Sequence, residues 1–156
     1  MNPHQLIKDS LDLLPLKMRG KKAERMLLAI GYQESGFTTR VQTRGPAVGF
    51  WQFEKMGGLY GVLEHSTTKE LARNWSENWT QNKEGKALDV LYEGFKTAEY
   101  DHLACIFARL LLWTHPKALP TTEDEAWRYY LDVWRPGKPH RNRWVNNWKT
   151  ADSKIK

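Results

Sequence analysis

Apolar residues recur along most of the chain at the three- and four-residue spacing of amphipathic helices. This spacing predicts a first helix from Pro3 until Pro15 ends it, and a second from about Lys21 to Ser35. Further helices are expected over residues 66–75, 86–95, 98–113 and 126–134, and a last short one around Trp144. The chain is therefore predicted to be mostly α-helical.

One predicted helix and one irregular segment organise this fold. Residues 98–113 are apolar on most sides, which predicts a central helix buried by the others. Residues 37–58 break the helical pattern with β-branched residues, a Gly-Pro pair and a Gly-Gly pair, so we expect irregular chain or a short hairpin there. Without a linker or a repeat, residues 1–156 are expected to form a single domain.

An acidic residue closes the second predicted helix. Glu34 follows Ile30 by four residues and Leu27 by seven, so it continues the apolar face, and Gly36 is suited to end the helix. Loss of solvent on that face and the negative end of the helix dipole both raise the pKa of a carboxyl group. A carboxyl protonated near neutrality is what a general acid requires, whereas the alternative is a solvated or paired helix-end glutamate.

Composition narrows the remaining chemistry. Of the 156 residues, 40% are apolar and 27% charged, and no apolar run is long enough to span a membrane. The first 20 residues have acids within their apolar part and no cleavage site, so we expect a folded helix and no signal peptide. Cys105 is expected to be a buried structural thiol, and the five scattered histidines predict no metal site. We expect no cofactor.

The net charge of +6 favours an anionic partner, such as nucleic acid, acidic lipid head groups or the polymers of a cell wall. Eight tryptophans offer faces that stack on a sugar ring or a base, although most are expected in the core. Charge alone does not choose among these partners.

A second motif follows the helix-ending acid. Glu34-Ser35 is followed by the glycine-bearing segment GPAVGFWQ, residues 45–52, which contains Gly45, Ala47, Gly49 and Gln52. An acid at a helix end followed by such a segment resembles the sequence motif of the lysozyme-like superfamily, specifically of its soluble lytic transglycosylase and goose-type lysozyme branch. Residues 108–120 and 126–140 resemble segments of phage-encoded murein-degrading enzymes of the same superfamily. The chain departs from that pattern by an inserted proline and by ARLLLW where many transglycosylases carry Ala-Tyr-Asn.

The resemblance implies a lysozyme-like domain that cleaves the β-1,4 bond between N-acetylmuramic acid and N-acetylglucosamine. Glu34 would be the general acid, and Ser35 would orient it or simply end the helix. Gln52 would hydrogen-bond the glycan, and the backbone at Gly49 would approach the sugar closely. The branch also places a late tyrosine near the acid, for which we prefer Tyr130 to its neighbour in the sequence.

Phe50 and Trp51 are candidates for a surface that stacks on sugar rings, with the alternative that one of them fills the core. Because neighbouring side chains point in different directions, we expect one ring to face each side. Phe50 and Trp51 are therefore both expected to bind substrate.

The choice between hydrolysis and lytic transglycosylation depends on a second carboxylate, which hydrolytic glycosidases place about 5–9.5 Å from the acid. Glu54 is the first candidate, and Glu64 and Asp101 are others. The competing interpretation is a surface Glu54 paired with Lys55 or Arg44. Lytic transglycosylases use a single acid, so the sequence leaves both reactions open.

Two classes of function compete with a murein glycosidase. One is a basic helical domain that binds nucleic acid through residues 138–144 and the tail, although Pro136 and Pro139 break the most basic stretch. The other is a cell-wall-binding module without catalysis. Under the leading interpretation the partners are peptidoglycan glycan strands and anionic outer-membrane lipid, with no nucleic acid, and the protein is a monomer. It would be a phage endolysin that is made in the host cytoplasm and acts in the periplasm. The alternatives are an enzyme carried in the virion and a bacterial enzyme.

Overall fold

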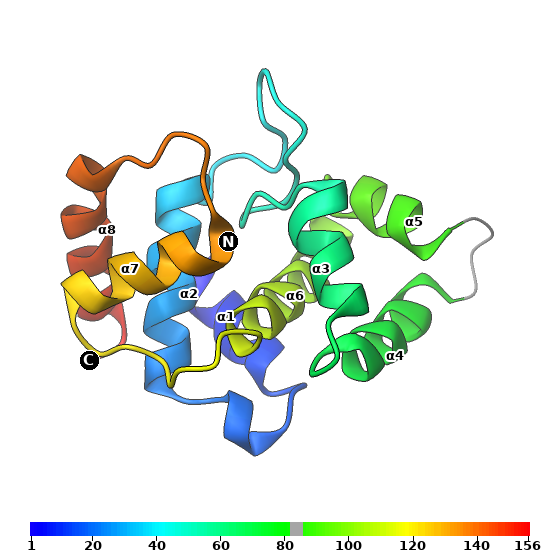
Figure 1. Cartoon of the computed structure of the whole chain (residues 1–156), viewed down its shortest axis with the longest axis horizontal. Coiled ribbons are helices and arrows are strands. Elements are labelled where there is room, and N and C mark those ends of the chain that lie inside the picture. The colour runs from blue at the N-terminus through cyan, green and yellow to red at the C-terminus, as the bar shows by residue number, and fades with distance from the viewer. Residues whose placement is uncertain (82–85) are drawn as a thin grey trace.

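The computed structural model describes residues 1–81 and 86–156, and these are mostly helical, as predicted (Figure 1). The long helices of the first half are α1 (Pro3–Leu11), α2 (Lys21–Glu34) and α4 (Lys69–Thr80), with a short α3 (Tyr60–Glu64) between the last two. The second half holds α5 (Ala87–Gly94), α6 (Asp101–Trp113), α7 (Glu123–Trp134) and α8 (Arg141–Lys154). Single turns of other helix types precede α2, α3 and α6 at Leu16–Met18, Lys55–Leu59 and Ala98–Tyr100.

The central position of α6 confirms the buried helix predicted from the apolar pattern. Ten of its residues are buried, and α1, α2, α3 and α4 all pack against it. Figure 1 shows α6 in the middle of the molecule. Its apolar residues belong to one hydrophobic cluster to which each of the eight described helices contributes. Cys105 lies in this cluster, and burial raises the pKa of its thiol to about 12, consistent with a structural thiol.

Polar residues set several helix ends. The Asn2 side chain accepts hydrogen bonds from two backbone N–H groups at the start of α1, and the Thr122 hydroxyl accepts one from the Glu125 N–H at the start of α7. Thr68 precedes α4, but its hydroxyl donates to the Val62 carbonyl at 2.7 Å and does not cap the helix. It therefore ties α4 to α3.

Residues 35–54 form the irregular segment that the sequence predicted after Glu34. Two isolated β-bridges, Val41–Val48 and Val48–Phe53, are its regular pairings. The guanidinium of Arg40 donates two hydrogen bonds to the carboxylate of Asp101, at 2.8 and 2.7 Å, and so fastens the segment to the start of α6. The prediction of irregular chain up to residue 58 extends too far, since a helical turn begins at Lys55, although Gly57 of the Gly-Gly pair has non-helical backbone angles (φ −97°, ψ −106°).

The last helix is longer than the short one predicted. α8 has 14 residues and packs along α2, burying Trp144, Trp148 and Ala151. The Asn147 amide donates to the Gln33 side chain at 2.7 Å, which joins α8 to the last turn of α2. No described helix is both long and apolar enough to cross a membrane. The packing of α8 on α2 brings a late segment of the chain beside Glu34.

Candidate active site

Glu34 is the last residue of α2, and the packing of that helix determines where its carboxyl group lies. Leu27 and Ile30 on the same face are fully buried, as predicted. Ser35 ends the helix, and its hydroxyl donates to the Phe50 carbonyl at 2.7 Å. Ser35 therefore holds the end of α2 against the following segment, and among the described residues its hydroxyl forms no hydrogen bond with the Glu34 carboxyl group.

Tyr130 of α7 donates a hydrogen bond from its hydroxyl to the Glu34 carboxylate. Burial raises the pKa of Glu34 from 4.5 to about 6, and the hydrogen bond from Tyr130 opposes that rise. The direction of this change agrees with the raised pKa expected from the sequence. Burial and the nearby charge of Glu34 raise the pKa of Tyr130 above its usual value, so the tyrosine keeps its proton and acts as the donor.

The packing around Tyr130 explains why this tyrosine, and not Tyr129, reaches the acid. The Tyr130 ring is 2% exposed and stacks on Trp144 of α8, with ring centroids 5.2 Å apart. Tyr129 points elsewhere, and its hydroxyl donates to the Leu112 carbonyl at 2.9 Å. The preference for Tyr130 therefore agrees with the geometry.

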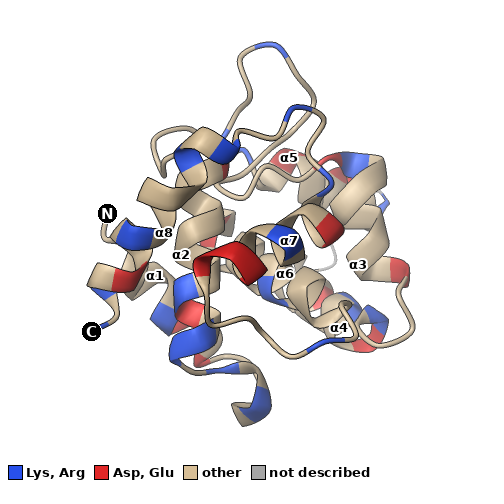
Figure 2. Cartoon of the chain, turned by 60° about the vertical axis from the view of Figure 1, so that its left-hand side comes forward, with Lys and Arg blue, Asp and Glu red and all other residues tan. Residues whose placement is uncertain are grey.

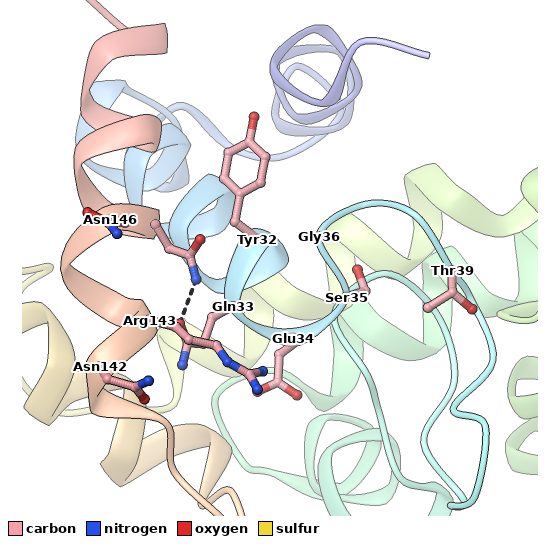
Figure 3. A pocket seen from close by; sticks show the side chains of 10 residues that line it. Tyr32, Gln33, Glu34, Ser35, Gly36, Thr39, Asn142, Arg143 and Asn146 are labelled. Carbon is pink, nitrogen blue, oxygen red and sulfur yellow. Dashed lines mark hydrogen bonds between the residues drawn. The ribbon is translucent and has the colours of Figure 1, made fainter.

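Three adjoining hollows form a groove that passes Glu34. The α8 hollow, about 530 Å³, lies between the end of α2 and α8 (Figure 3). The middle hollow, about 630 Å³, lies between the irregular segment and the chain that follows α7. The α3 hollow, about 800 Å³, lies between the chain around α3 and the end of α7. The shared lining residues are Gln33, Glu34, Thr39 and Arg143 for the first two hollows, and Gln52, Glu54, Trp134 and Arg135 for the last two.

Gln52 and Glu54 both line the middle and α3 hollows, as expected for residues near a substrate. Gln52 is half-buried with a positive φ of 53°, and its side-chain amide donates to the Gly49 carbonyl at 2.8 Å. Glu54 is exposed, and no ion pair among the described residues includes it. Lys55, one of its expected partners, binds Asp89 instead at 2.8 Å.

The other candidate carboxylates are engaged away from the groove. Asp101 is 6% exposed and accepts both hydrogen bonds from Arg40. Glu64 forms an exposed ion pair with Arg73, at 3.0 Å, and lines none of the three hollows. Glu54 is therefore the remaining candidate for a second carboxylate.

The predicted stacking surface of Phe50 and Trp51 is wrong, because both rings lie in the core. Phe50 is 2% exposed beneath Arg40, and Trp51 is fully buried with its indole N–H donating to the Leu27 carbonyl at 2.9 Å. The expectation of one ring on each side assumed an extended strand. Gly49 and Gln52 instead have positive φ angles, so the chain turns between them and sends both rings inward.

Gly49 has a conformational reason to be glycine. Its φ of 81° lies in the region that other residues rarely adopt, and an added Cβ would meet Phe95 at an ordinary 3.5 Å. Gly49 is buried and is not among the residues that line the three hollows. The close approach of its backbone to a sugar stays a prediction.

Apart from Tyr130, the residues that α7 and α8 bring to the groove were not assigned to the site from the sequence. Trp134 is half-buried, lines two hollows and donates from its indole N–H to the Trp51 carbonyl at 2.9 Å. Figure 3 shows Arg143 reaching from α8 toward Glu34. Asn142 and Asn146, one helical turn apart, also face the α8 hollow. Their spacing was visible in the sequence, but the contact of α8 with α2 was not.

Both polar and charged side chains line the groove. Within residues 1–81 and 86–156, no three His, Cys, Asp or Glu side chains form a group suited to a metal ion. Lysines and arginines are spread over several helices and mixed with acidic residues, which fill the first turn of α7 (Figure 2). The positive charge is therefore distributed over the surface.

This arrangement suits proton transfer to an extended polar substrate. A carboxyl group with a pKa of about 6 donates a proton near neutral pH and accepts one when ionised. The groove extends on both sides of Glu34 and has room for an extended chain substrate. Comparisons with protein-family models, with curated proteins and with solved structures found no match, so the resemblance to the lysozyme-like superfamily rests on the residues of this chain.

Proposed function

We propose that this protein is a peptidoglycan glycosidase that cleaves the β-1,4 bond between N-acetylmuramic acid and N-acetylglucosamine. The observation that carries the proposal is the half-buried Glu34, whose pKa is raised to about 6, at the junction of two hollows of a continuous groove. Such a group protonates the leaving glycosidic oxygen, as the acid of glycosidases does.

The lining of the groove supports a carbohydrate polymer as the substrate. Side-chain amides supply both donors and acceptors, which match the hydroxyl and acetamido groups of amino sugars. The amide-bearing residues are Gln33, Gln42, Gln52, Asn142, Asn146 and Asn147. Trp134 adds an aromatic surface between the middle and α3 hollows. The missing platform of Phe50 and Trp51 is thus replaced by a ring from α7.

The proposed reaction begins when Glu34 donates its proton to the glycosidic oxygen and the bond to the muramic acid C1 breaks. The resulting carboxylate, stabilised by the hydrogen bond from Tyr130, then acts as a base. In lytic transglycosylation it takes the proton of the muramic acid 6-hydroxyl, whose oxygen bonds to C1 and closes an anhydro ring. In hydrolysis a water molecule attacks C1 in place of that hydroxyl. Hydrolytic glycosidases commonly use a second carboxylate for this reaction.

Purified peptidoglycan tests the proposal directly. We expect the protein to clear a suspension of cell-wall sacculi, and Glu34→Gln to lower the rate by about 10²–10⁴-fold without loss of fold. Glu70→Gln is the matched control, because Glu70 is exposed on α4 and lines none of the three hollows. Near-normal clearing by Glu34→Gln, or no clearing by the wild-type protein, would sink the assignment.

Mass spectrometry of the soluble products distinguishes the two reactions. Anhydro products, lighter by one water than reducing products, indicate transglycosylation. If reducing products dominate, Glu54→Gln tests the second carboxylate, because Glu54 shares the middle hollow with Glu34. Loss of the reducing products in that variant assigns the role to Glu54.

The partners and setting belong to the same proposal. A monomer with net charge +6 is attracted to the anionic wall and to anionic outer-membrane lipid. The setting proposed is that of a phage endolysin, which reaches the periplasm through a pore made by another protein. Binding to DNA that falls steeply with salt, without wall clearing, would favour the nucleic-acid alternative.

A further inference from the structure

The α8 hollow has polar groups that the proposed cleavage does not use. Its wall is held in place by Gln33, which donates to the His140 carbonyl at 3.0 Å and accepts from Asn147 at 2.7 Å. Asn142 and Asn146 also line it, and both are exposed without a side-chain hydrogen bond in the described part of the chain. The hollow therefore presents rigidly held and free amides side by side.

Arg143 gives this hollow a positive charge beside the catalytic acid. It is exposed, and none of the ion pairs between described residues uses it, not even one with Glu34. Figure 3 shows its side chain extending over the hollow from α8. A guanidinium without a protein partner, set in a concave polar surface, is suited to bind a carboxylate with two parallel hydrogen bonds.

We propose that the α8 hollow binds the acidic substituent of the muramic acid residue next to the cleaved bond, with Arg143 contacting one of its carboxylates. This inference rests on the proposed function and names the substrate feature that the groove recognises. In murein, muramic acid carries a lactyl group that is either a free carboxylate or joined to a peptide with carboxylates of its own. The amides of Asn142 and Asn146 then face the peptide bonds of that substituent.

The position of the hollow makes recognition selective. It meets the middle hollow at Glu34, so a substituent bound there fixes the glycan with one particular bond beside the acid. A neutral glycan of N-acetylglucosamine alone has nothing for Arg143 to contact. The protein is therefore expected to prefer murein to chitin-type chains.

The experiment compares soluble murein strands with the same strands after their carboxyl groups have been converted to amides. With acidic strands we expect Arg143→Gln to raise KM about tenfold or more with little change in kcat, the effect of losing one hydrogen bond between charged groups. With amidated strands the wild type and Arg143→Gln should have similar KM values. Lys149→Gln, which removes the same charge from an exposed position of α8, should change neither.

Further measurements identify which carboxylate Arg143 contacts, and they distinguish failure of this inference from failure of the proposed function. Strands stripped of peptides retain the lactyl carboxylate, so a persistent effect of Arg143→Gln assigns that group and a lost effect assigns the peptide. An unchanged pH–rate profile in Arg143→Gln shows that the arginine does not act through Glu34. Equal loss on acidic and amidated strands overturns the recognition role alone. A wild-type protein that neither cleaves nor binds acidic strands overturns both this inference and the proposed function.

Discussion

The hydroxyl of Tyr130 on α7 donates a hydrogen bond to the carboxylate of Glu34, 96 residues earlier in the chain. The contact lowers the pKa of Glu34 while burial raises it, and burial has the larger effect. The acidity of the carboxyl group is therefore adjusted by two elements that meet only in the folded protein.

Replacement of Tyr130 by Phe should raise the pKa of Glu34 further above 6, because the hydrogen bond that favours the charged form is lost. A general acid is active when protonated, so activity falls as pH rises through its pKa. We expect the alkaline limb of the pH–rate profile to move to higher pH in Tyr130→Phe.

The matched control is Tyr129→Phe, which removes a hydroxyl bonded to the backbone carbonyls of Leu112 and Lys117. It should leave the position of that limb unchanged, although it lowers stability. A Tyr130→Phe profile that coincides with the wild type would contradict the coupling.

Glu34→Gln should stabilise the fold near neutral pH. Because the folded pKa of about 6 exceeds 4.5, ionising Glu34 disfavours folding, and stability is lost as pH rises from about 4.5 through 6. Glutamine avoids this loss and retains an acceptor for Tyr130. At about 1.4 kcal/mol per pKa unit, the gain in unfolding free energy at pH 7 is up to about 2 kcal/mol.

Denaturant unfolding at pH 7 and pH 4 measures this effect. The gain should vanish at pH 4, where both the folded and the unfolded glutamate are largely protonated. An equal difference between the two proteins at both pH values would show that the variant acts through packing and not through ionisation.

The helices and the acid were predictable because they depend on local pattern. The spacing of Leu27 and Ile30 places Glu34 at the end of a buried face, which accounts for its raised pKa. By contrast, the inward positions of Phe50 and Trp51 follow from positive φ angles on both sides of them, one at a glutamine that the sequence does not mark as a turn residue. The assumption that neighbouring side chains alternate between two faces therefore predicted the wrong positions for these two rings.

The groove was only partly predictable because its walls come from distant segments. Arg143 lies in it because α8 packs along α2, and that contact depends on the complementary shapes of two helix faces. The sequence pattern likewise predicts only an ordinary apolar helix position for Trp134. Its role at the groove follows from its indole bond to the Trp51 carbonyl.

Asp101→Asn should lower the unfolding free energy by about 1.5–3 kcal/mol, the value of a hydrogen bond to a charged group. Asp101 is 6% exposed and receives both donors of Arg40, which lies in the irregular segment that carries Gln52. Glu64→Gln is the comparison, because it breaks an exposed ion pair and should cost at most about 1 kcal/mol. Equal losses by chemical denaturation would refute the anchoring role.

Trp134→Phe should raise KM for murein strands and cost about 1 kcal/mol of stability, since the donor to the Trp51 carbonyl is lost along with part of the groove surface. Trp75→Phe makes the same chemical change at a half-buried position of α4 that lines none of the three hollows. It should leave KM unaltered. An unchanged KM in Trp134→Phe would remove this ring from the substrate surface.

The contacts of Glu34 with late segments also bear on the order of folding. A growing chain that has formed α2 but not yet α7 and α8 lacks Tyr130, Trp144 and Arg143 around the acid. Without the burial that those segments contribute, we expect the pKa of Glu34 to stay close to that of a solvated glutamate. The raised pKa of Glu34 is therefore expected only when the two ends of this long-range contact have met, so that acid strength itself reports the completion of the fold.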